Sequence, residues 1–225
     1  MVLRLVLQSA VWLVFMAALL FVPAGRLDWS GGWIFLAAFA ISAVALGGWL
    51  AHHDPALLRA RMGPLVQRGQ KAWDKAFMIT FLVLWHAWLV LMALDAGRWR
   101  WSTVPAWLQA VGAIGFVLCM ILCYFTFRAN SYAAPVVRIQ RERGQQVISS
   151  GPYRYVRHPM YGGALCLFVG APLMLGSWLG LATAPLLVVL LATRAVLEER
   201  TLAEELEGYR DYAARVRYRF VPLVW

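Results

Sequence analysis

The sequence predicts an all-α, polytopic integral membrane protein with about six transmembrane helices and an amphipathic C-terminal helix. Two observations support this prediction. Of the 225 residues, 62% are hydrophobic and only 14% are charged, whereas an ordinary soluble domain is about half apolar and about a quarter charged. Six apolar stretches also reach, or nearly reach, the roughly 20 residues that a helix needs to cross a bilayer core. A soluble globular protein and a disordered chain are therefore excluded.

The six predicted spans follow one another through mostly short connections. They run over Leu3–Val22, Gly31–Leu50, Ala76–Leu94, Val104–Phe127, Tyr161–Leu175 and Trp178–Leu197. We interpret the first as a helix rather than a signal peptide, because its apolar stretch is long and no clear small-residue cleavage site follows it. The fifth is the shortest. Only Gly176-Ser177 separates it from the sixth, which predicts a tight helical hairpin.

Positive charge predicts the orientation of these spans. Of the 21 Lys and Arg residues, only Arg26, Arg98 and Arg100 fall in the loops on one side, so 18 fall on the other. Such an excess marks cytoplasmic loops, and we expect both termini on that side. The predominance of Arg over Lys suggests a bacterial inner membrane. The net charge of +10 is then mainly a topology feature that also attracts anionic lipids, which disfavours a nucleic-acid groove.

By composition, the chain divides after residue 127. Residues 1–127 hold four spans with little polar chemistry, whereas residues 128–225 hold most of the charge and the polar clusters. We therefore expect a four-helix transmembrane part followed by a catalytic part.

The first polar cluster precedes the fifth span. Gly151-Pro152 predicts a turn, and His158-Pro159 predicts the start of a membrane helix, because a proline is tolerated at the first helical position. His158, Tyr161 and nearby free backbone N–H groups would then lie at a helix start that favours an anionic ligand group. A topogenic loop without a ligand explains these residues equally well.

The second cluster lies at the end of the sixth span. Arg194 and Glu198 are four residues apart and share a helix face, so they form either an ion pair that caps the span or part of a cavity. The adjacent Glu199 points about 100° away. One glutamate is therefore free for another role.

Two further patterns are given a structural interpretation. Apolar residues recur every three or four positions at Leu202, Leu206, Tyr209, Ala213, Val216 and Phe220. They predict an amphipathic helix that lies on the membrane surface or closes over the loop. His52-His53-Asp54 has no second cluster with metal-ligand spacing, so a helix-ending turn before Pro55 is favoured over a metal site.

Taken in order, the motifs of residues 128–225 resemble the membrane methyltransferases typified by isoprenylcysteine carboxyl methyltransferase. Phospholipid N-methyltransferases are similar through their paired glutamates. The residues that carry the resemblance are Gly151-Pro152-Tyr153, Arg157-His158-Pro159-Met160-Tyr161, Arg194, Glu198-Glu199, Leu202, Tyr209 and Tyr212.

The resemblance implies S-adenosylmethionine as the cofactor. By matching positions, the cofactor contacts would be Gln145, Gln146, Val147, Ile148, Tyr153, His158, Pro159, Met160, Tyr161 and Glu198, with Arg138 and Gln140 nearby. Arg194 matches an arginine on the substrate side. The chain departs from the prenylcysteine enzymes in lacking their histidine at Gln145-Gln146 and in having Met160 for a small residue. These departures disfavour a prenylcysteine substrate more than they disfavour the cofactor.

The expected function is methyl transfer to a lipophilic acceptor, either a carboxylate, a thiol or a lipid amine, at the cytoplasmic face. Arg194 would position a carboxylate or thiolate, and Glu199 would take the proton of an amine. Neither a metal nor a covalent intermediate is required.

Two other functions remain open. One is an NADPH-dependent membrane reductase acting on a sterol or enone, in which Arg138, Arg141 and Arg143 would bind the 2′-phosphate. The other is a transporter or assembly protein without catalysis, in which the glutamates only form ion pairs.

Overall fold

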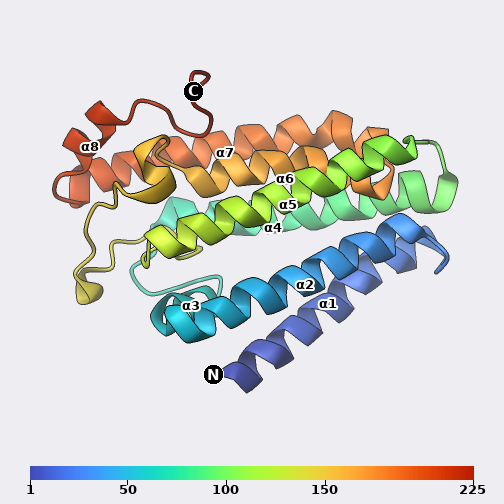
Figure 1. Cartoon of the computed structure of the whole chain (residues 1–225), viewed down its shortest axis with the longest axis horizontal. Helices are drawn as coiled ribbons and strands as arrows, with labels where there is room; N and C mark the ends of the chain where they lie inside the picture. The colour runs from blue at the N-terminus through green and yellow to red at the C-terminus, as the bar shows by residue number, and fades with distance from the viewer.

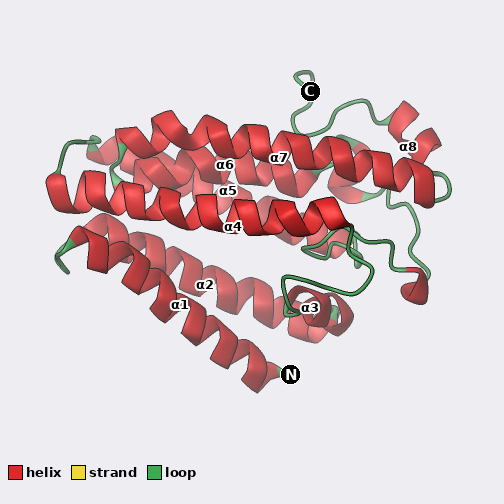
Figure 2. Cartoon of the chain, turned by 180° about the vertical axis from the view of Figure 1, so that it is seen from behind, coloured by secondary structure: helices red, strands yellow, loops and turns green.

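The structure, a computed structural model, describes residues 1–225 and consists of helices and loops without strands (Figure 2). Five helical segments are long and apolar enough to cross a membrane: α1 (Val2–Ala24), α2 (Ser30–His53), α4 (Ala72–Met92) with its π-helical continuation η1 (Ala93–Trp99), α5 (Ala106–Ala129) and α7 (Trp178–Glu205). A sixth apolar helix, α6 (Pro159–Leu175), has 17 residues. The predicted all-α polytopic fold is confirmed, and the span predicted to be shortest is the shortest.

The other elements gather at one end of the helical bundle (Figure 1). They are α3 (Pro55–Arg61), η2 (Arg141–Arg143), η3 (Gly151–Arg154) and α8 (Tyr209–Arg215). We call this end, with residues 54–71, 130–158 and 206–225, the loop end. At the opposite end the chain makes only short turns, so the long irregular segments are all on one side.

The tight turn between α6 and α7 is formed as predicted. Gly176 ends α6 in the left-handed conformation, with φ 82°, which glycine adopts without strain. The Ser177 hydroxyl accepts from the Gly180 N–H at 2.8 Å and donates to the buried carboxylate of Asp95 at 2.6 Å. Asp95 also accepts from the Ser102 hydroxyl. These bonds fix the hairpin to η1 at the end remote from the loops.

Helices α5 and α6 approach each other through glycines. A Cβ at Gly170 would lie 2.7 Å from the carbonyl oxygen of Gly112, and a Cβ at Gly112 would lie 2.7 Å from that of Gly170. In lipid, where apolar burial does not drive helices together, such small residues allow the close backbone packing that holds helices together. This contact fixes α6, whose N-cap residue is His158 and whose first turn carries Tyr161.

The C-terminal helix is shorter than the amphipathic pattern predicts. Helix α7 continues to Glu205, Gly208 has φ 78°, and α8 ends at Arg215. The chain beyond α8 is not helical because its carbonyl groups bond elsewhere: the N–H groups of Arg157 and His158 donate to Tyr218 and Arg219. This segment lies against the start of α6.

The favoured turn before Pro55 is confirmed. Helix α2 ends at His53, and the Asp54 carboxylate caps α3 by accepting from the Leu57 N–H at 2.9 Å. No group of three or more His, Cys, Asp or Glu side chains converges in the structure.

Because α5 and α6 pack closely, adding a methyl group at their contact should lower the stability of the protein. We expect Gly170→Ala to lower the stability by about 1–3 kcal/mol, because one of the two backbones must move. Gly48→Ala is the matched control, since nothing lies within 4 Å of its Cβ, and alanine favours a helix by about 1 kcal/mol over glycine. Melting temperatures of both variants in detergent measure the effect. Equal shifts for the two variants would contradict the packing argument.

Candidate functional site

A cavity of about 270 Å³ opens at the loop end. Side chains from α3, α4, the segment between α5 and α6, the first turn of α6, α7 and α8 line it, and most are hydrophobic. Its lining includes residues on both sides of position 127. The site is therefore built from both of the parts into which the composition divides the chain.

Almost all of the predicted site residues meet in this cavity. The lining contains Arg138, Gln145, Gln146, Val147, Ile148, Tyr153, His158, Pro159, Met160, Tyr161, Arg194 and Glu198. Gln140 and Glu199 are not among the lining residues. The fold thus brings residues 138–148 next to the start of α6 and the last turns of α7.

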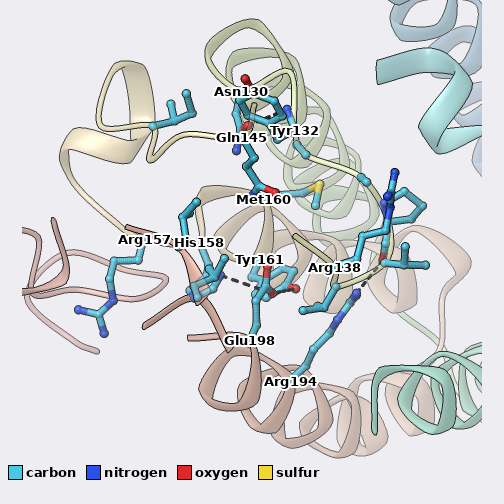
Figure 3. Close-up of a pocket in the computed structure, with 18 of the residues that line it drawn as sticks. Asn130, Tyr132, Arg138, Gln145, Arg157, His158, Met160, Tyr161, Arg194 and Glu198 are labelled. Carbon is cyan, nitrogen blue, oxygen red and sulfur yellow. Dashed lines mark hydrogen bonds and ion pairs between the residues drawn. The ribbon is translucent and has the colours of Figure 1, made fainter. Parts of the chain in front are cut away.

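Glu198 lies in the cavity lining beside Tyr161 and His158 (Figure 3). The Tyr161 hydroxyl donates to Glu198 Oε2 at 2.6 Å, and His158 Nδ1 lies 3.9 Å from the same oxygen. The rings of His158 and Tyr161 are stacked, with centroids 5.0 Å apart. A carboxylate has about four acceptor positions, so Glu198 can still accept hydrogen bonds from a ligand.

The structure corrects the expectation for Glu199. Its carboxylate accepts from Arg157 Nε at 2.6 Å and from Arg219 Nε at 3.0 Å, and it lies 3.1 Å from His158 Nε2. Figure 3 shows the Arg157 side chain directed away from the cavity. Adjacent helix residues diverge by about 100°, so Glu199 faces the C-terminal segment while Glu198 faces the cavity. Glu199 therefore lies outside the cavity lining and contacts His158, which lines it.

Gln140 is also placed differently from the expectation. It is 1% exposed, and its side-chain amide donates to the Tyr132 carbonyl oxygen at 2.8 Å and accepts from Arg143 Nη1 at 2.7 Å. The backbone N–H of Gln140 donates to the Gln145 side chain at 2.7 Å. Gln140 therefore shapes the loop, and Gln145 is the member of this pair that lines the cavity.

Arg194 does not form the capping ion pair with Glu198. Its Nη2 lies 3.0 Å from Asp74 Oδ1 and donates to the Pro135 carbonyl oxygen at 2.6 Å. Its guanidinium lies 4.8 Å from the centroid of the Phe77 ring. The partner of Arg194 is therefore on α4, not on its own helix.

Asp74 is a buried residue that the sequence analysis missed. It is completely buried, and its Oδ2 accepts from the Val137 N–H and from Gln70 Nε2, both at 2.8 Å. An acidic residue at the edge of an apolar span is a pattern that could have identified it, because ionisable groups in membrane segments usually have a partner. Asp74 joins α4 to α7 and to the loop wall.

The start of α6 is less open than the sequence predicts. The His158 N–H donates to the Arg219 carbonyl oxygen at 2.8 Å, and Pro159 has no N–H. The N–H groups of Tyr161 and Gly162 donate to His158. Only the Met160 N–H remains free, so this helix start by itself provides little to hold an anion.

Helix α8 contributes Tyr209 and Tyr212 to the cavity lining. The Tyr212 hydroxyl donates to the Tyr153 carbonyl oxygen at 2.9 Å, and burial raises the pKa of Tyr212 to about 12. Burial also raises the pKa of Tyr153 and of Tyr209, so all three phenols stay neutral. The buried Tyr209 hydroxyl has no protein partner, and neither do the Nε atoms of Arg138 and Arg194.

Comparison with known families adds one finding to this geometry. Residues 107–207 match the phospholipid methyltransferase family. The match begins at the second residue of α5 and covers the following loop, α6 and all of α7. It confirms the resemblance to phospholipid methyltransferase-like membrane methyltransferases. No curated protein matches the chain.

The cavity extends beyond the segment that matches this family. Arg61, Phe77, Met78 and Phe81 precede it, and Tyr209 and Tyr212 follow it. The matched segment therefore supplies most of the lining, including Glu198, Tyr161 and His158, while the other lining residues come from the rest of the chain.

Because Asp74 and Arg194 form a buried ion pair, substitutions at the two positions should have non-additive effects on stability. Asp74→Leu leaves a buried guanidinium without a counter-charge, and breaking such a pair costs about 3–5 kcal/mol. We expect Asp74→Leu/Arg194→Met to be less destabilised than the sum of the two single variants, by about 0.5–3 kcal/mol. Melting temperatures of the wild type, both singles and the double complete the cycle. Additive effects would show that the two charges do not stabilise each other.

Proposed function

We propose that the protein transfers a methyl group from S-adenosylmethionine to a lipophilic acceptor at the cytoplasmic face of the membrane. The strongest support is that most residues of the cavity lining belong to the segment that matches a methyltransferase family. The cavity in which Glu198, Tyr161 and His158 meet residues 145–148 lies largely within the segment that matches a methyltransferase family. The wide lining of mixed polarity is suited to a polar donor and an oily acceptor together.

The unused polar atoms of the lining fit the groups of this cofactor. Glu198 has free acceptor capacity for an amine or for ribose hydroxyls. The unpartnered Tyr209 hydroxyl and Arg138 Nε can donate to acceptor atoms of the ligand. The neutral phenols of Tyr153 and Tyr212 offer aromatic surface to a cationic sulfonium.

When bound, S-adenosylmethionine supplies a methyl carbon that its sulfonium already makes electrophilic. The residues of the chain then have to hold the donor and acceptor in line and exclude water. Helix α8 covers the polar side, and Phe77, Phe81 and Leu191 provide an apolar wall for the acceptor. Arg194 contributes its unpartnered Nε as a donor, because Asp74 already compensates its charge.

The lining also bears on the chemical class of the acceptor. Glu198 is the only carboxylate that lines the cavity, and Glu199 is held by Arg157 and Arg219 outside it. If Glu198 binds the donor, no second carboxylate remains to take a proton from an amine. This favours an acceptor that arrives deprotonated, a carboxylate or a thiolate. A lipid amine is the alternative acceptor that the same methyl-transfer assay detects.

Ligand binding separates the proposed function from its rivals. We expect the purified wild-type protein in detergent to bind S-adenosylhomocysteine in isothermal titration and not to bind NADPH. Binding of NADPH alone would instead support the membrane reductase. Binding of neither nucleotide would support a protein without catalysis.

Glu198→Gln tests the residue at the centre of the site. The glutamine keeps the size and the bond from Tyr161 but removes the charge, and a hydrogen bond to a charged group contributes about 1.5–3 kcal/mol. We expect S-adenosylhomocysteine to bind about ten- to a hundredfold more weakly to this variant. Glu204→Gln, an exposed position on the same helix, is the control and should bind like the wild type. Unchanged affinity of the Glu198 variant would refute the assignment.

A further inference from the structure

Four arginines line the cavity, and three of them have a carboxylate partner. The pairs are Arg138 with Glu142 at 2.7 Å, Arg157 with Glu199 at 2.6 Å and Arg194 with Asp74 at 3.0 Å. Arg61 is the fourth, and no carboxylate lies within 4 Å of its guanidinium. The cavity therefore has one lining arginine whose charge the protein does not compensate.

The position of Arg61 is well fixed. It is the last residue of α3, whose Leu57 and Leu58 pack in a small apolar cluster with Leu50 and Phe127. Arg61 Nη1 donates to the Ala133 carbonyl oxygen at 2.8 Å, and the guanidinium lies 4.4 Å from the centroid of the Phe127 ring. Arg61 Nε and Nη2 donate to no protein atom. These two nitrogens are adjacent on the fork of the guanidinium.

An uncompensated cation in this position has an electrostatic cost. Arg61 is half-buried, and its desolvation lowers the pKa of the guanidinium. Buried charges are normally paired, because desolvation disfavours a charge without a partner. A ligand anion beside Arg61 would remove this cost in the bound state.

The start of α6 does not offer an alternative anion site. Its N–H groups are bonded to the C-terminal segment or to His158, except for that of Met160. The other lining arginines already face carboxylates. Arg61 is thus the cationic group of the lining that is free to receive an anion.

We propose that Arg61 binds an oxyanion, a carboxylate or a phosphate, of a ligand in this cavity. The guanidinium fork with two adjacent free N–H groups matches the geometry of such groups. The identity of the ligand rests on the proposed function, in which either of two molecules supplies the oxyanion. They are the amino-acid carboxylate of the methyl donor and an anionic group of the acceptor.

Two pairs of probes distinguish these sources. S-adenosylhomocysteine carries the carboxylate, whereas 5′-methylthioadenosine lacks the whole amino-acid end. Octyl phosphate is an anionic lipophile, whereas octanol is its neutral counterpart. Each is titrated against the full-length wild type, Arg61→Gln and the control Arg59→Gln, an exposed arginine on the same helix.

We expect Arg61→Gln to weaken the binding of S-adenosylhomocysteine, octyl phosphate or both by about tenfold or more, as loss of a charged hydrogen bond does. Binding of the counterpart that lacks the oxyanion should be unchanged. Loss for S-adenosylhomocysteine assigns Arg61 to the donor carboxylate. Loss for octyl phosphate assigns it to the acceptor. Arg59→Gln should resemble the wild type with all four probes.

Three results would overturn the proposal: unchanged binding of both anionic probes, equal loss for the charged and neutral members of a pair, or a wild type that binds neither anion. Equal loss would show that Arg61 acts only through the fold. A wild type that binds octyl phosphate through Arg61 but does not bind S-adenosylhomocysteine would refute the proposed function and support the anion site. The two hypotheses therefore fail separately.

Discussion

The buried carboxylate of Asp74 is the constraint on which the site depends. Arg194 projects from a membrane helix into an apolar bundle, where an isolated charge is costly. Asp74 compensates that charge with one oxygen and holds the Val137 N–H with the other. The same side chain thereby joins α4, α7 and the irregular wall between α5 and α6. The loop that lines the cavity is ordered by an interaction made inside the bundle.

Charge compensation also determines which groups of the cavity face a ligand. The partners of Arg138, Arg157 and Arg194 lie outside the lining, so these arginines contribute donors more than net charge. The free acceptor capacity belongs to Glu198, and the uncompensated cation is Arg61. The cavity therefore has one acidic and one uncompensated basic group in its lining. Such an arrangement suits ligands that carry both signs of charge.

The sequence predicts the spans, the hairpin and most of the lining. The length of each apolar stretch and the order of the motifs are local properties that can be read without knowing the packing. It does not predict the partner of Arg194, since the i, i+4 spacing to Glu198 favours a local pair and only packing brings α4 alongside α7. Arg61 was missed for the same reason: α3 meets Ala133 only in the folded chain. The divergence of Glu198 and Glu199 follows from helix geometry, but which of them faces the cavity depends on Arg157 and Arg219. The C-terminal amphipathic helix ends earlier than its pattern predicts, because backbone bonds to the start of α6 compete with helix formation.

The C-terminal segment at Tyr218 and Arg219 has a consequence for biogenesis. Its carbonyl groups hold the backbone of Arg157 and His158, and Arg219 shares Glu199 with both of them. These residues leave the ribosome after every apolar helix, and chains generally fold from the N-terminal side during synthesis. The contacts that hold the backbone of His158 can therefore form only after all six apolar helices have been synthesised. A nascent chain halted before Tyr218 would contain every apolar helix of the bundle but lack the contacts that fix His158 beside the cavity.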